Sequence, residues 1–277
     1  TRQSSSGKVV EATRMAYGAA ILGDHIAWSD IEDVFATACR TKSDPVVEQT
    51  IEFIRRLLSD NYVEWHEVEG ILKQVVETRS ESVATGTIVV ANTALQYSIA
   101  DWDQVSDLVD LARQNSQDSI IIEAIRMISA GLIEEVVQWA QVSAFLNSTL
   151  ESSSDDVTIE TIRGVGRAFY HDAIAWSPVA NFIYTARKSG TDPVVIEAAK
   201  AFVICLRNSD IEWSELSHIS EDSSEDRSLY PLFDEILSKT PPSTRLILLK
   251  QLHTWSLDGA ALFDAPEILE RGLKDDE

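Results

Sequence analysis

Few side chains in this sequence occur at spacings that support catalysis or metal binding. No two of the five histidines are four residues apart, and no Cys-x-x-Cys pair is present. Zinc sites normally need such clustered ligands, and the Gly-rich and Gly-x-Ser-x-Gly patterns of phosphate and acyl-transfer sites are missing too. Gly164 and Gly166 fall within a predicted helix, where they indicate close packing. We therefore predict no catalytic residue, no metal site and no cofactor.

Oppositely charged residues recur three positions apart in three successive segments. The pairs are Glu123 with Arg126, Glu160 with Arg163, and Glu197 with Lys200. Side chains at i and i+3 share one face of a helix, so these pairs predict a ladder of ion pairs along one surface. Two interpretations stay open. The ladder is either a solvated surface, with about 0.2–0.5 kcal/mol per pair, or a polar track for a protein ligand.

An uncharged stretch, residues 82–100, breaks this pattern. At the aligned positions it offers Gly86, Val89 and Asn92, and the segment before it carries Glu52 and Arg55. Small and apolar residues there predict either tighter packing against a neighbouring helix or an apolar patch that docks a partner. The candidate partner-binding residues are Arg55, Gly86, Val89, Asn92, Glu123, Arg126, Glu160, Arg163, Glu197 and Lys200.

A run of acidic residues and serines at 220–226 is a third candidate. Ser223 has Asp226 three residues further on, a pattern that acid-directed kinases favour. Phosphorylation would add charge to an already acidic segment. The alternative is a plain flexible loop.

The tryptophans reveal the elements that must position these residues. Six of the seven are 37 positions apart, and the gap to the seventh, Trp255, is different. The six are Trp28, Trp65, Trp102, Trp139, Trp176 and Trp213. Such a fixed period is the mark of a tandem-repeat architecture.

Each 37-residue unit carries two helical patterns. Apolar residues follow each tryptophan at the spacing of an amphipathic helix. Sixteen positions after it stands an acid, followed by proline in Asp44-Pro45 and Asp192-Pro193. This predicts an N-cap with proline at the first position of a second helix. Neither helix buries enough apolar surface alone, so successive hairpins must stack.

The repeat predicts an all-α fold, an α-solenoid of tandem two-helix repeats that forms a single domain over residues 1–277. Residues 6–27 align with a second helix and predict an N-terminal half repeat. Residues 213–277 depart from the period and predict a divergent C-terminal cap. The full repeats between them are 28–64, 65–101, 102–138, 139–175 and 176–212.

The period and the turn resemble the HEAT/armadillo superfamily of α-solenoids. The best match is Asp192-Pro193 with the following run Val195-Ile196-Glu197-Ala198-Ala199-Lys200-Ala201-Phe202, which is similar to the second-helix signature of HEAT repeats. The resemblance covers residues 6–212, and the family's characteristic arginine is replaced in every repeat. It implies a right-handed superhelix, a concave surface lined by second helices, and a role as a scaffold or protein-binding platform.

The charge balance limits the classes of partner that the chain is expected to bind. The chain has 45 acidic and 23 basic residues, a formal charge of −22. This field repels nucleic acids and anionic lipid surfaces and attracts basic protein segments. The alternative interpretation is that the excess acid only keeps a long surface soluble. No stretch is apolar enough to insert into a membrane. The isolated Cys39 and Cys205 predict no disulfide and a reducing, cytoplasmic or nuclear, compartment.

Three functions fit these observations in decreasing order. The first is a non-enzymatic scaffold or adaptor that recognises a protein segment along the second helices. The second is a structural spacer or self-assembly module of a larger protein. The third is a HEAT-like enzyme. An iron-binding class of such enzymes uses several His-Glu dyads, and this chain has only His66-Glu67. A DNA glycosylase of this kind needs a basic groove, which the charge disfavours.

Overall fold

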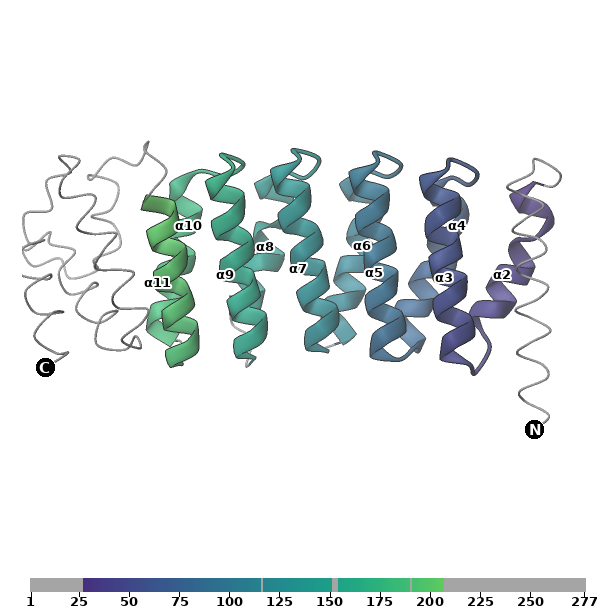
Figure 1. The fold of residues 1–277 in the computed structure, drawn as a ribbon, viewed down its shortest axis with the longest axis horizontal. Coiled ribbons are helices and arrows are strands. Elements are labelled where there is room, and N and C mark those ends of the chain that lie inside the picture. The colour runs from purple at the N-terminus through teal and green to yellow at the C-terminus, as the bar shows by residue number, and fades with distance from the viewer. Residues whose placement is uncertain (1–26, 116, 151–153, 190, 207–277) are drawn as a thin grey trace, which may run out of the picture. The chain divides into compact units, whose positions relative to one another are not determined.

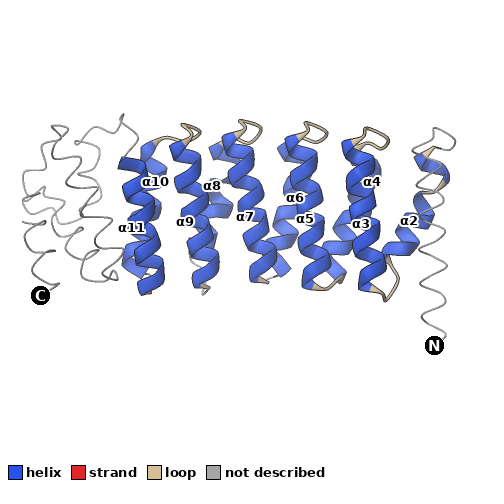
Figure 2. Cartoon of the chain, viewed as in Figure 1, coloured by secondary structure: helices blue, strands red, loops and turns tan. Residues whose placement is uncertain are grey.

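The computed structural model describes residues 27–115, 117–150, 154–189 and 191–206. These residues form helices joined by short loops, with no strand among them (Figures 1 and 2). The all-α prediction is therefore confirmed for the described part of the chain. The half repeat at 6–27 (except its last residue), the cap at 213–277 and the acidic segment with Ser223 lie outside the described residues.

The tryptophans open the first helix of each repeat, as their spacing predicts. These helices are α4 (Trp65–Thr78), α6 (Trp102–Asn115), α8 (Trp139–Leu150) and α10 (Trp176–Ser189). In the first repeat the tryptophan opens a 3-10 turn, η1 (Trp28–Asp30), which leads into the shorter α2 (Glu32–Cys39). The second helices are α3 (Asp44–Ser59), α5 (Glu81–Gln96), α7 (Asp118–Ile133), α9 (Asp155–Tyr170) and α11 (Asp192–Leu206).

The chain divides into two compact units, one ending at Gln141 and the other beginning at Val142, so the division falls within α8. In the first unit α3 packs on α5, α5 packs on α7, and α4 packs on α6. In the second unit α9 packs on α11, and α10 packs on both. Helices thus contact their hairpin partner and the matching helix of the next repeat, which is solenoid packing. The single domain over 1–277 and the superhelix hand stay predictions.

The tryptophans build the junctions between repeats. Trp65 is 1% exposed, and its indole Nε1 donates to the backbone oxygen of Gln104 in the next repeat over 3.2 Å. Trp28, Trp102 and Trp176 are buried as well. A buried indole removes about 150–250 Å² from water, so the four buried tryptophans each contribute a large apolar area, whereas Trp139 is only half-buried. This explains why the tryptophan marks the period so sharply.

The start of the second helices lies one residue earlier than predicted. The acid is the first helical residue rather than the N-cap. The N-cap position holds Ser43, Ser80 and Ser154 in α3, α5 and α9, and Gln117 in α7. None of these serines makes a side-chain capping hydrogen bond. The acids instead place negative charge in the first turn, where it complements the helix dipole. The prediction of an acidic N-cap is therefore wrong by one position, although the acid still favours the same helix end.

The second helices α3, α5, α7 and α9 end in the same left-handed turn. The residues with positive φ are Asn61, Ser98, Glu135 and Asp172, with φ between 55° and 59°. In the turn after α7, Glu135 N donates to Leu132 O, and Val136 N donates to Gly131 O. These two bonds define a Schellman motif, which normally places glycine at the left-handed position. The turns here are made without glycine.

Candidate functional site

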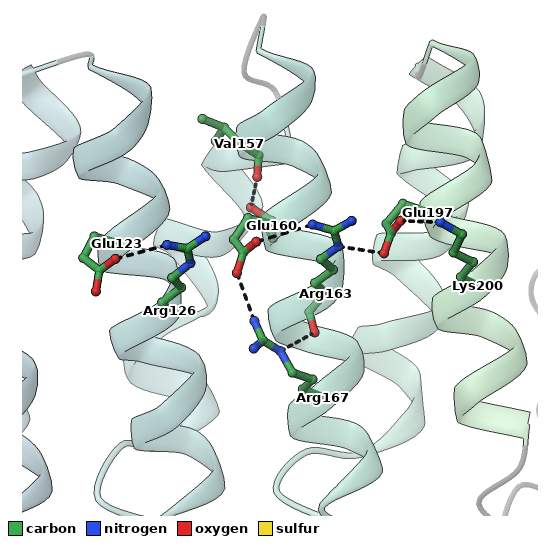
Figure 3. A network of polar contacts seen from close by, with 9 residues as sticks. Glu123, Arg126, Val157, Glu160, Arg163, Arg167, Glu197 and Lys200 are labelled. Carbon is green, nitrogen blue, oxygen red and sulfur yellow. Dashed lines mark hydrogen bonds and ion pairs between the residues drawn. The ribbon is translucent and has the colours of Figure 1, made fainter.

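The charged residues of the second unit form one connected network (Figure 3). The Nε of Arg163 on α9 donates to Oε1 of Glu197 on α11 over 2.8 Å. Lys200 reaches the other oxygen of that carboxylate at 3.2 Å. Glu160 is approached by Arg163 at 3.9 Å and by Arg167 at 3.0 Å. The network therefore crosses between two helices as well as following each one.

The carboxylates of this network lie beneath the cations. The Glu160 and Glu197 side chains are 10% and 13% exposed, whereas Arg163 is 48% exposed. Burial alone would raise the pKa of Glu197, but hydrogen bonds from Arg163 and Lys200 outweigh it and lower that pKa. The bond to Glu197 also raises the pKa of Arg163. Both groups stay charged at neutral pH, and they cross-link α9 and α11.

The corresponding pair in the first unit is looser. On α7, Arg126 Nη1 lies 3.4 Å from Glu123 Oε2, and the arginine side chain is 53% exposed. On α5 the same two positions hold Gly86 and Val89, so no ion pair forms there. The predicted ion pairs are thus present in α7, α9 and α11.

A hollow of about 150 Å³ lies between α3 and α5 in the first unit. Its lining is apolar except for three charged side chains that all come from α3. It brings together three of the candidate residues, one from α3 and two from α5. The lining residues are Glu48, Ile51, Glu52, Arg55, Val83, Gly86, Val89 and Val90.

The polar side of the hollow is held rigid by ion pairs. Arg55 binds Glu52 through two bonds, Nε to Oε2 at 2.8 Å and Nη2 to Oε1 at 2.9 Å. Arg56 adds a bond to Oε1 at 3.1 Å. The hydrogen bond from Arg55 is the main reason that the pKa of Glu52 falls to about 2. A two-pronged pair of this kind fixes the orientation of the guanidinium.

Gly86 keeps the hollow open. A Cβ added to Gly86 would meet nothing within 4 Å. The same repeat position holds Glu123 in α7 and Glu197 in α11, and Glu197 is largely buried against Arg163 of the preceding second helix. The hollow is therefore the place where a repeated carboxylate is missing. Next to it, Val89 is one of the large apolar side chains that the described residues leave exposed, at 37%.

Asn92 does not join the hollow. It lies on α5 and is half-buried, and its Oδ1 is buried without a hydrogen-bond partner among the described residues. The structure also adds two residues that the sequence interpretation omitted. Glu48 lines the hollow, and Arg167 binds Glu160 from seven residues away. Two helical turns separate that pair along one face, so a search at i+7 would have found it.

The described residues contain no cluster of three or more His, Cys, Asp or Glu side chains placed to hold a metal ion. Within the same ranges, no helix combines the length and apolar character needed to cross a membrane.

Comparisons with protein-family models, curated proteins and solved structures found no match to this chain. The class of the protein therefore rests on its own architecture. Tandem 37-residue helical hairpins, packed on their neighbours within each compact unit, define an α-helical repeat protein.

Proposed function

We propose that this chain is a non-enzymatic scaffold or adaptor of the HEAT/armadillo type, which binds a protein segment on the surface formed by its second helices. The hollow between α3 and α5 is the observation that carries the proposal. It interrupts a repeated row of charged side chains and offers apolar surface instead. Concave, mostly apolar sites with a few fixed polar groups are the usual form of a binding site.

Two further features support a binding role. The Glu52–Arg55 pair presents a fixed guanidinium and carboxylate at the edge of the hollow, so polar atoms of a ligand would meet oriented partners. The formal charge of −22 would speed encounter with basic protein segments and repel nucleic acids. On this proposal the partner is a protein and the site of action is the cytoplasm or nucleus.

The test compares the proteins that copurify with the wild-type chain and with two variants in which a glycine is replaced by leucine. Gly86→Leu fills the hollow, whereas Gly70→Leu adds the same side chain on α4, where an added Cβ also meets nothing within 4 Å. We expect a stoichiometric partner with the wild type and with Gly70→Leu that is lost with Gly86→Leu. Recovery of the same proteins with all three chains would contradict binding at the hollow.

A control for the charged row belongs in the same experiment. Arg126→Glu reverses a cation that is 53% exposed, and circular dichroism checks that the variant is folded. Loss of the partner with Arg126→Glu but not with Gly86→Leu would move the contact to the charged residues. A chain that copurifies with nothing but changes mass with concentration would favour the self-assembly alternative.

A further inference from the structure

The α3–α5 hollow has the size of one side chain. An apolar cavity of about 150 Å³ is known to hold a molecule of the size of benzene, and the hollow has about that volume. A leucine, isoleucine or methionine side chain is of similar bulk. The hollow is therefore too small for a folded element and large enough for a single aliphatic anchor.

The buried lining favours apolar atoms. Ile51, Val83 and Val90 are each at most 3% exposed, so their side chains form the inner wall. A polar group placed against them would lose its bonds to water without gaining new ones. Val89, which is 37% exposed, extends this apolar surface outward, so the backbone of a bound segment would also pass over apolar atoms.

The charges at the edge select against an acidic guest. Glu52 is already engaged by Arg55 and Arg56. Glu48 accepts a hydrogen bond from the Ser82 hydroxyl at 2.8 Å, and no lysine or arginine among the described residues pairs with it. Arg56 does not line the hollow, and of the three charged groups that do, Glu52 and Arg55 neutralise each other and Glu48 remains. An incoming carboxylate would therefore meet a net negative charge at the lining, whereas a lysine or arginine would neutralise it.

We propose that the α3–α5 hollow is an anchor pocket for one aliphatic side chain of a linear protein segment, and that Glu48 pairs with a lysine or arginine close to that side chain. The proposal rests on the proposed function, since it specifies what the second-helix surface binds. Gly86 creates the pocket, the buried valines and Ile51 select the anchor, and Glu48 selects the neighbouring charge.

A displayed library of random linear peptides, selected on the whole chain, tests this. The expected winners share an aliphatic residue with a lysine or arginine nearby. Synthetic copies should lose about tenfold or more in affinity when the aliphatic residue becomes serine, the loss typical of a buried anchor. Gly86→Leu should cause a similar loss, and Gly70→Leu should change the affinity less than about twofold.

A second variant tests the charge. Glu48→Lys should reverse the preference, so that glutamate beside the anchor binds better than lysine. Peptides that bind the chain but ignore both Gly86→Leu and Glu48→Lys would overturn the anchor pocket and leave protein binding elsewhere on the surface intact. A library that yields no binder would overturn both proposals.

Discussion

Arg163 and Glu197 join neighbouring second helices more closely than either residue is joined within its own helix. The distance from Arg163 Nε to Glu197 Oε1 is 2.8 Å, compared with 3.9 Å from Arg163 to Glu160 and 3.2 Å from Lys200 to Glu197. Arg163 and Glu197 therefore contribute more to the contact between α9 and α11 than to the helix that carries each of them.

Removal of this cross-link should destabilise the fold measurably. We expect Arg163→Ala to lower the free energy of unfolding by about 1–2 kcal/mol, because it leaves a largely buried carboxylate with one cation, while the exposure of Arg163 to solvent limits the loss. Arg126→Ala removes the arginine at the same repeat position, which is 53% exposed and lies 3.4 Å from Glu123, and should cost less than Arg163→Ala. If urea unfolding gave the same loss of stability for both variants, the bond between α9 and α11 would add no stability of its own.

The acid stability of the first unit should depend on Glu52. Its folded-state pKa of about 2 lies below the ordinary value of 4.5, so ionised Glu52 stabilises the fold above pH 4.5, and this contribution is lost as the pH falls towards 2. Wild type should thus exceed Glu52→Gln in stability at pH 7, and the gap should close by pH 2. The side chain is 45% exposed, so solvent screening keeps the gap small. A gap that does not change with pH would assign it to packing.

Replacement by alanine should change the stability of the fold in opposite directions at Gly131 and Gly86. A Cβ at Gly131 would lie 2.6 Å from Cγ2 of the buried Val137, and the bond from Val137 N to Gly131 O holds the two close together. Gly131→Ala should therefore destabilise by about 1–3 kcal/mol. Gly86→Ala, in open space, should stabilise by about 0.5–1 kcal/mol through helix propensity. Thermal unfolding of the two variants decides the sign of each effect.

Replacement by glycine should stabilise the fold at Glu135 and destabilise it at the adjacent Glu134. Glu135 has φ of 59°, which costs an L-residue about 1–2 kcal/mol, so Glu135→Gly should raise stability by about 0.5 kcal/mol after the entropy cost of glycine. Glu134, at φ of −86°, gains no such relief, and Glu134→Gly should destabilise. Stabilisation by both changes would point to charge removal as the cause.

The indole hydrogen bond should make one tryptophan less replaceable than another. Trp65→Phe removes the bond to Gln104 and part of the buried ring, and we expect a loss of about 2 kcal/mol. Trp28 is also buried, but its Nε1 has no hydrogen-bond partner among the described residues. Trp28→Phe should therefore cost about 1 kcal/mol less than Trp65→Phe. Denaturant unfolding followed by circular dichroism measures both.

The fold was predictable because the same sequence pattern occurs in every repeat. The repeated tryptophan predicts where α4, α6, α8 and α10 begin, because it occupies the same position at the start of the first helix in each of these repeats. The left-handed turns were predictable only in part. Asn61 and Asp172 are of types that adopt positive φ more readily, whereas Ser98 and Glu135 give no sign of it.

The candidate site was predictable in part, for a different reason. Gly86, Val89 and Arg55 stood out as departures from their columns, and all three line the hollow. Glu48 and the Arg163–Glu197 bond were missed, because both depend on which side chains of neighbouring second helices approach one another. Spacing within one helix carries no information about that distance.

The bond from Trp65 to Gln104 gives the stack a polarity. The donor belongs to the earlier repeat and the acceptor to the later one. Loss of the repeat that begins at Trp102 would leave the indole N–H of Trp65 without its acceptor and expose its ring to solvent. Loss of the repeat that begins at Trp28 would leave the bond between Trp65 and Gln104 in place. At this junction, loss of the later repeat should therefore destabilise the repeat of Trp65 more than loss of the earlier repeat does.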